Sequence, residues 1–304
     1  MTSLIHAATG AAGDRERRAL SHRAEIAIVR ELWNQQSAAN TEQTDPAGMA
    51  YLASHFSMEL TLKRHLKVID AISPYIRGRV LEWGCRHALD SCVYRMRFGS
   101  AVELHGCDGF TPGTYQVFHA FSGIRYAQLH HPYHLDYDDE TFDVVTSNGV
   151  LEHVPDDRSS IQEIFRVLKP GGTFVVTCLP NRYSYTEALQ RLRSGPAHDR
   201  LYTIRLASGL LLDAGFQVKR TSYFLMLPTM LNGFPRPLKQ VYRRMGGLVW
   251  ATNSLLERLW PLNRLASNLL LIATKPDSPG SPRCSGEEAP SRLPTGPTHV
   301  ESPP

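Results

Sequence analysis

Residues 80–91 read V-L-E-W-G-C-R-H-A-L-D-S, and this stretch decides the fold. Residues 80–83 are mostly apolar, which is typical of a buried strand, and Gly84 then predicts a tight turn. A helix is expected from about residue 88 to 97. Arg86 and Ala88 stand where further glycines would be expected in a nucleotide-binding turn. The stretch therefore predicts a strand–turn–helix unit whose turn could bind a ligand.

Strand and helix signals alternate after this unit. Strands are expected over 102–107, 124–128, 142–147, 173–178, 216–223 and 268–274. Helices are expected over about 157–168, 184–193 and 203–213, the first of them ended by K-P-G-G at 169–172. Buried strands separated by helices indicate an α/β fold with a parallel sheet that is covered on both faces.

The chain divides into four parts by composition. Residues 1–13 are expected to be a mobile N-terminus, and residues 14–72 to form N-terminal helices, one up to about 36 and one over 50–72, with a linker over 37–49. The main domain is expected over 73–275. The tail from 276 to 304 is rich in Pro, Ser, Gly and Glu, which predicts disorder.

Bulk composition restricts the class of protein. A formal net charge of +4 over 304 residues gives no reason to expect a nucleic-acid partner. Five cysteines without metal-type spacing favour reduced thiols. The sequence shows neither a secretory signal nor an uncharged apolar run of about 18–20 residues, so we expect a soluble, cytoplasmic protein.

Ligands of an open parallel sheet bind at the carboxyl ends of its strands. This rule selects Glu82 to Ala88, Asp108, the loop 128–134, and Ser147 to His153 as candidate site residues. A carboxylate at Asp108 could accept hydrogen bonds from both hydroxyls of a ribose, each contributing about 1.5–3 kcal/mol. The alternative is that Asp108 only caps the segment that follows it.

The ordered motifs resemble a known family. V-L-E-W-G-C at 80–85, F-D-V-V at 142–145, L-E-H-V-P at 151–155 and R-V-L-K-P-G-G at 166–172 resemble the class I S-adenosylmethionine-dependent methyltransferases, and most closely the type-11 methyltransferase domain. The resemblance covers about residues 60–225. It implies a Rossmann-like, doubly wound, mostly parallel seven-stranded sheet whose last strand, at 268–274, is antiparallel.

The resemblance also implies roles for single residues. Glu82 and Gly84 would border the methionine part of S-adenosylmethionine, and Asp108 would hold its ribose. Ser147 and Asn148 would lie beside the cofactor. The neighbouring Cys85, Arg86 and Gly109 complete the expected cofactor site.

Three positions depart from the family pattern. Arg86 and Ala88 replace usual glycines, and a non-glycine residue at a positive φ costs roughly 1–2 kcal/mol. This strain is small beside the about 8 kcal/mol of micromolar binding. Arg86 is expected to point to solvent or, alternatively, toward the carboxylate of the cofactor. His131 stands where the family carries an acid that contacts adenine.

His153 is the candidate general base, because histidine titrates near neutral pH. The alternative is that His153 only shapes the pocket, as it does in many members of the family. Glu152 and His153 also resemble part of the metal site of ubiquinone-pathway O-methyltransferases. Those enzymes carry another Glu where this chain has Gly149, so no metal is expected.

Residues 224–265 are an insertion before the last strand that mixes large apolar residues with arginine and lysine. We expect a helical cap here. Its apolar face could be core, or it could form a lid over an apolar or anionic substrate, or it could contact anionic lipid at the periphery of a membrane.

The sequence therefore predicts methyl transfer from S-adenosylmethionine to a small-molecule acceptor or a lipid- or glycan-linked one. The alternative is a catalytically inactive relative that acts as a binding or partner subunit. A nicotinamide-dependent oxidoreductase fits less well, since G-x-G-x-x-G is absent after the first strand.

Overall fold

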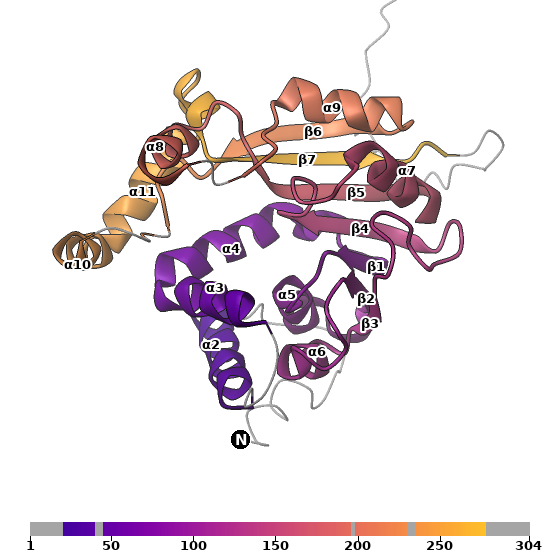
Figure 1. Ribbon diagram of the computed structural model, residues 1–304, viewed down its shortest axis with the longest axis horizontal. Helices are drawn as coiled ribbons and strands as arrows, with labels where there is room; N and C mark the ends of the chain where they lie inside the picture. Colours follow the sequence, from indigo (N-terminus) through magenta and orange to yellow (C-terminus); the bar gives the residue numbers. More distant parts are fainter. Residues whose placement is uncertain (1–20, 40–44, 196–197, 230, 232–234, 278–304) are drawn as a thin grey trace, which may run out of the picture.

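The computed structural model describes residues 21–39, 45–195, 198–229, 231 and 235–277. Its centre is a seven-stranded sheet with strand order β3-β2-β1-β4-β5-β7-β6 (Figure 1). The strands are β1 (Gly78–Trp83), β2 (Val102–Asp108), β3 (Arg125–Gln128), β4 (Phe142–Asn148), β5 (Leu168–Pro180), β6 (Gln217–Phe224) and β7 (Asn268–Thr274). β7 runs antiparallel to β5 and β6, and all the other strand pairs are parallel. The predicted Rossmann-like sheet is confirmed.

The directions of the strands gather several chain segments at one edge of the sheet. β1 pairs with β2 on one side and β4 on the other, so the switch point of the sheet lies at β1. β5 and β6 are both antiparallel to β7, and both Pro180 and Phe224 lie opposite Asn268. The segment between β6 and β7 therefore starts and ends at the carboxyl edge of the parallel strands.

Helices cover both faces of the sheet, as the buried strands require. The faces alternate along β1, since Val80 packs into one core and Leu81 into the other. In Figure 1, α4 and α5 lie on one side of the sheet and α7 and α9 on the other. The first side carries α2 (His22–Ala39), α3 (Pro46–Ser57), α4 (Glu59–Ile72), α5 (Leu89–Phe98) and α6 (Gln116–Ser122), and the second carries α7 (Asp157–Val167) and α9 (Ile204–Asp213).

The N-terminal helices differ from the sequence-based prediction. The helix expected over 50–72 is two helices, α3 and α4, because Met58 adopts an extended conformation with φ −122° and ψ 121°. The linker is also shorter than expected, since α2 continues to Ala39 and α3 begins at Pro46. Asp45 starts α3 by accepting a hydrogen bond from the amide of Gly48 at 2.8 Å.

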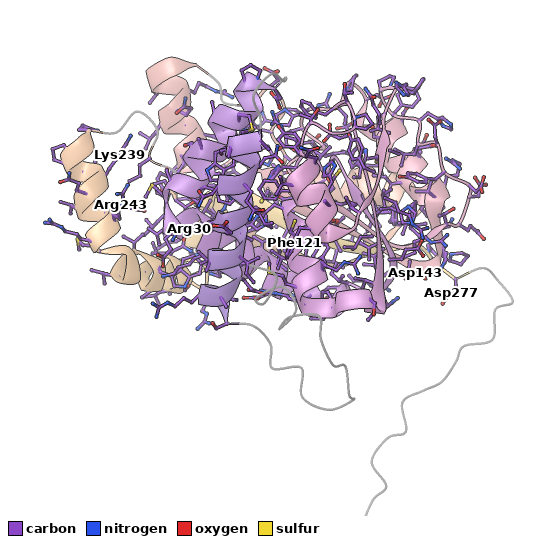
Figure 2. All side chains as sticks on the ribbon, turned by 90° about the horizontal axis from the view of Figure 1, so that it is seen from below. Arg30, Phe121, Asp143, Lys239, Arg243 and Asp277 are labelled. Atoms are coloured by element: carbon purple, nitrogen blue, oxygen red, sulfur yellow. The ribbon has the colours of Figure 1, made fainter. Side chains whose placement is uncertain are left out.

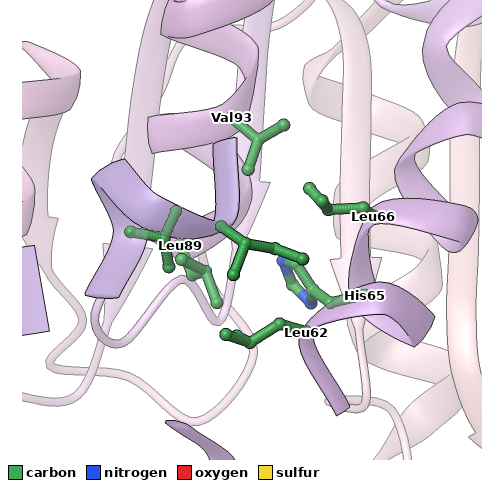
Figure 3. Close-up of a pocket in the computed structure, with 7 residues that line it drawn as sticks. Leu62, His65, Leu66, Leu89 and Val93 are labelled. Atoms are coloured by element: carbon green, nitrogen blue, oxygen red, sulfur yellow. The ribbon is translucent and has the colours of Figure 1, made fainter. Parts of the chain in front are cut away.

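α2, α4 and α5 pack around a cavity of about 10 Å³ (Figure 3). Six of its seven lining residues are aliphatic, and the seventh is His65. A cavity of this size and polarity is at the lower limit for holding even one water molecule. It is therefore a packing defect of the core and too small for a substrate.

The insertion before β7 is helical, as predicted. It contains α10 (Arg236–Arg244), α11 (Gly246–Leu256) and the short η3 (Leu262–Leu265), and it lies near α8 (Tyr185–Ser194) in Figure 1. No helix of the described residues is both long and apolar enough to cross a membrane. The predicted N-terminus of 1–13 and the tail from 278 lie outside the described residues.

Candidate active site

The turn after β1 has positive φ angles at Gly84 and at two residues that are not glycine, Arg86 and Ala88. Gly84 has φ +69°, and its amide and that of Cys85 donate to the carbonyl of Cys107 at the end of β2. Arg86 and Ala88 also have positive φ, at 43° and 55°. Both residues therefore impose the backbone strain expected from the sequence.

Gly84 is required for a close approach between two loops. A Cβ at this position would lie 2.5 Å from Cγ2 of Val150, in the loop after β4. The loops that follow β1 and β4 are thus in direct contact at the switch point. Only glycine fits both this contact and the positive φ.

Asp108 ends β2, and its carboxylate is held by the turn. Oδ2 accepts the amide of Arg86 at 2.8 Å, and Oδ1 accepts the amide of Gly109 at 2.6 Å. Burial nevertheless raises the pKa of Asp108. Each oxygen has a second lone pair, so a fixed carboxylate with remaining acceptor capacity stands at the carboxyl edge.

The side chain of Arg86 is held within the protein. Its Nη2 lies 2.6 Å from Oδ2 of Asp45, and its Nε donates to the same atom and to the hydroxyl of Tyr115. The guanidinium also lies over the ring of Phe110, 5.0 Å from its centroid. The expectation that Arg86 points to solvent was therefore wrong. The reason is the N-terminus of α3, which brings Asp45 against the turn.

Glu82 and Asn148 are each hydrogen-bonded to a residue of α5, Glu82 to Ser91 and Asn148 to Asp90. Ser91 donates its amide to Oε2 of Glu82 at 2.9 Å, and its hydroxyl bonds the same oxygen. Burial, followed by the charge of Asp90, raises the pKa of Glu82. Asn148 donates to Asp90 at 3.1 Å, and Nε2 of His65 lies at ion-pair distance, 2.8 Å, from the other oxygen.

Among the polar atoms in and after β4 that have no hydrogen-bond partner within the described part of the chain are Oγ of Ser147 and Oε2 of Glu152, and both residues are buried. Burial raises the pKa of Glu152 to about 7. Buried polar atoms are usually paired, so these two are candidates to contact a bound molecule.

His153 lies beside Glu152 but is exposed. Burial of part of its ring, followed by the charge of His198, lowers its pKa. His198, in the loop before α9, is 2.6 Å from Glu187. One ligand atom each of Glu152, His153 and His198 lie within 4.8 Å of one another, a set that could hold a metal ion. The absence of a metal stays a prediction.

His131 lies in the loop after β3, and this loop is tied to the site through the amide of Leu129, which donates to the carbonyl of Asp108 at 2.7 Å. The ring itself is turned back on its own loop. Its Nδ1 accepts the amide of His134 at 2.9 Å, and it packs edge-on against Tyr133. A contact of His131 with adenine stays a prediction.

Sequence reasoning missed five residues around the site: Asp45, His65, Asp90, Tyr115 and His198. Asp45-Pro46 is a recognisable helix start, but the pairing of Asp45 with Arg86 spans 41 residues and has no local signal. The other four residues reach the site by tertiary packing and carry no spacing that would identify them.

Comparison with known proteins places this geometry in a family. The methyltransferase-domain family model matches residues 81–176, which contain the turn, Asp108 and the loop after β4. The chain belongs to the S-adenosylmethionine-dependent methyltransferases, and the methyl donor of this family is S-adenosylmethionine. The resemblance expected from the motifs is confirmed.

Individual relatives support this assignment. A ubiquinone biosynthesis O-methyltransferase of Pseudomonas putida is 33% identical over 164 residues, covering 50% of this chain and 69% of the relative. A "Probable S-adenosylmethionine-dependent methyltransferase" of Mycolicibacterium smegmatis is 37% identical over 160 residues, covering 52% and 60%. The chain thus spans about three fifths of the length of the Mycolicibacterium relative.

A solved structure supports the fold. The "Phospholethanolamine N-methyltransferase 2" of Haemonchus contortus, determined in complex with phosphomonomethylethanolamine and S-adenosylhomocysteine, has a TM-score of 0.53 at 18% identity. The match covers 82% of this chain and 60% of the Haemonchus chain. At this identity the likeness concerns the fold.

Proposed function

We propose that this chain transfers a methyl group from S-adenosylmethionine to a small-molecule acceptor or to a lipid- or glycan-linked one. The observation that carries the proposal is the carboxylate of Asp108, fixed by the amides of Arg86 and Gly109 beside the Gly84 turn. This carboxylate stands at the switch point, where a doubly wound sheet binds its ligand.

The proposed cofactor site uses both sides of the switch point. Asp108 would accept the ribose hydroxyls, and Glu82, Gly84 and Cys85 would border the methionine part. Gly109 and His131 would lie toward the adenine, and Ser147 and Asn148 beside the sulfonium. Arg86 would position the turn through its amide, while its side chain holds α3 through Asp45.

The chemistry needs alignment more than activation. The sulfonium is already a strong electrophile, so the protein has to place a nucleophile in line with the methyl group. The acceptor forms the new bond to the methyl carbon, the carbon–sulfur bond breaks, and S-adenosylhomocysteine leaves. For a hydroxyl acceptor, His153 is the proposed base that takes the proton, and its lowered pKa leaves it neutral and able to do so at pH 7.

The alternative proposal is a relative without catalysis that acts as a binding or partner subunit. The replacement of two turn glycines by Arg86 and Ala88 favours it, because both residues strain the turn. The two proposals differ in whether label moves from the cofactor to another molecule.

Transfer of tritium from methyl-labelled S-adenosylmethionine separates the two proposals. The purified chain is incubated with the labelled cofactor and with aqueous and lipid extracts in turn. We expect label in one extract with the wild type and about a hundredfold less with Asp108→Asn, which loses charged contacts of about 1.5–3 kcal/mol each. Asp136→Asn, an exposed carboxylate outside the proposed site, is the matched control. Cofactor binding without transfer to either extract would favour the non-catalytic relative.

We further propose that the protein works in the cytoplasm and contacts a membrane at its periphery through residues 224–265. The thiols of Cys85, Cys92, Cys107 and Cys178 are free, which suits a reducing compartment. Peripheral contact is supported by the surface of the cap.

A further inference from the structure

The outer surface of the cap is unusually apolar. Of the sixteen large hydrophobic side chains that are exposed among the described residues, nine lie within residues 238–265. Trp260 is 78% exposed, and Leu248 and Leu255 are 59% and 58% exposed. We call the exposed apolar side chains of 238–265 the cap face. Such a concentration on a surface marks an interaction site.

The helix α11 (Gly246–Leu256) buries a polar side chain, Asn253, and exposes two of its leucines, Leu248 and Leu255. Asn253 is buried and accepts the amides of Met226 and Leu227, at 2.7 and 2.9 Å. Glu257 accepts the amide of Leu225 and pairs with Lys67 of α4. Leu248 and Leu255, seven residues apart, lie on the outer side. An ordinary surface helix turns its leucines toward the core and its polar side chains toward solvent. The exposed leucines of α11 therefore suit contact with a second apolar surface.

Cations accompany the cap face. Residues 225–267 contain six basic residues and one acidic residue, Glu257, whose carboxylate is already paired with Lys67. Arg243, Arg244 and Arg258 are exposed and have no ion-pair partner among the described residues. The cap is thus both apolar and strongly basic.

Two of these cations, Arg243 and Arg244, line a hollow beside the cap face. It has a volume of about 180 Å³ and lies between the start of α4 and the junction of α10 with α11. Its lining includes Lys63, Arg243 and Arg244, and also Glu59, which is bound to Lys63 at 2.8 Å. The two arginines leave a net positive charge, which suits a phosphate group.

The cap face stands at the edge of the sheet that carries the site. β6 ends at Phe224 and β7 begins at Asn268, both at the carboxyl edge where Asp108 and Asn148 also end their strands. Figure 2 shows Lys239 and Arg243 of α10 at one end of the molecule, with Asp143 and Asp277 at the other. A surface that docks through the cap would therefore lie near the proposed site.

We propose that the cap face docks on an anionic lipid bilayer, with the apolar side chains in the interface and the hollow holding a lipid phosphate. Aromatic, leucine-rich and basic surfaces together are what such an interface binds. A second copy of the chain is disfavoured, because a symmetric contact would bring Arg243, Arg244 and Arg258 against their own counterparts. Docking deepens the membrane contact proposed above and does not depend on methyl transfer, whereas the consequence that the acceptor is lipid-linked rests on the proposed methyl transfer.

The test is flotation of the full chain with vesicles of phosphatidylcholine alone and of phosphatidylcholine mixed with phosphatidylglycerol. We expect binding to the mixed vesicles only. Arg243→Ala with Arg244→Ala should weaken it by about thirtyfold, since each basic residue near an anionic surface contributes about fivefold. Leu248→Ser with Leu255→Ser should weaken it by at least about tenfold. The matched control is Leu206→Ser with Leu212→Ser on α9, which is similarly exposed and should bind as the wild type does.

Three results would overturn the proposal. They are no binding to mixed vesicles, equal binding to both vesicle types, and self-association of the chain that Leu248→Ser with Leu255→Ser abolishes. Trp260 gives an independent signal, since its fluorescence should shift to the blue on docking and Trp260→Phe should remove most of that shift. Cofactor binding should be unchanged in the cap variants, and vesicle binding unchanged in Asp108→Asn, so failure of the two proposals can be told apart.

Discussion

The two halves of the carboxyl edge treat their acidic side chains differently. On the β1–β2 side, Oε2 of Glu82 accepts hydrogen bonds from Ser91, and each oxygen of Asp108 accepts one backbone amide, from Arg86 or Gly109. On the β4 side, Oε2 of Glu152 is buried and has no hydrogen-bond partner among the described residues. The first half is preorganised for a ligand of fixed shape. The second half still has an atom that can hydrogen-bond to the acceptor. Members of one family share the cofactor but differ in their acceptors.

Gly84 joins the two halves, and adding a side chain there should give the largest effect on stability. Gly84→Ala would place a Cβ 2.5 Å from Val150 at a φ of +69°. Strain and overpacking together should lower the free energy of unfolding by about 3 kcal/mol. Gly209→Ala, in α9 with open space around it, should instead raise it by about 0.5–1 kcal/mol. Equal denaturation midpoints for the two variants would show that the loops are not in contact.

The buried carboxyl of Glu152 should make stability depend on pH. Its folded pKa of about 7 is above the usual 4.5, so the fold prefers the protonated form. Stability is therefore lost as pH rises from about 4.5 through 7, in total by about 3 kcal/mol. Glu152→Gln should remove this loss and be more stable than the wild type at pH 8. The variant Glu31→Gln, on the surface of α2, should follow the wild-type curve, and parallel curves for all three would refute the assignment.

Substitution of Asp45 tests whether the β1–β2 side of the carboxyl edge depends on the N-terminal helices. Burial alone would raise its pKa, but hydrogen bonds from Arg86, Gly48 and Tyr115 outweigh burial and lower it. Asp45→Ala removes the cap of α3 and the partner of Arg86, and should cost about 2 kcal/mol by chemical denaturation. Asp70→Ala, which breaks a more exposed contact with Arg97, should cost at most about 0.5 kcal/mol. Similar losses for both would mean that the Asp45–Arg86 pair adds nothing.

Ala88 should give the smallest effect. Ala88→Gly relieves the strain of φ 55° by about 1 kcal/mol but loses a fully buried methyl group worth about 0.8 kcal/mol. We expect a change in unfolding free energy within about 0.5 kcal/mol and cofactor affinity within about twofold. A much tighter cofactor complex would show that the missing glycine has impaired the site.

The sequence predicted what is local and missed what is long-range. The turn after β1 and the R-V-L-K-P-G-G motif, which spans the end of α7 and the start of β5, each lie within a single supersecondary unit, so the local sequence specifies their structure. The break between α3 and α4 at Met58 could not be predicted, because no glycine or proline lies at it. The direction of Arg86 depends on α3, and the approach of His198 to Glu152 depends on the packing of a loop from beyond β5. Such contacts are set by tertiary packing, which single-sequence periodicity does not encode.

The central claim is that Asp108 and the turn after β1 bind S-adenosylmethionine, and calorimetric titration tests it most directly. The wild type, Asp108→Asn and Asp136→Asn are each titrated with the cofactor. The account predicts saturable binding to the wild type and to Asp136→Asn, and affinity lower by at least about a hundredfold for Asp108→Asn. No heat of binding for the wild type at millimolar cofactor, or equal affinity for all three proteins, would contradict it.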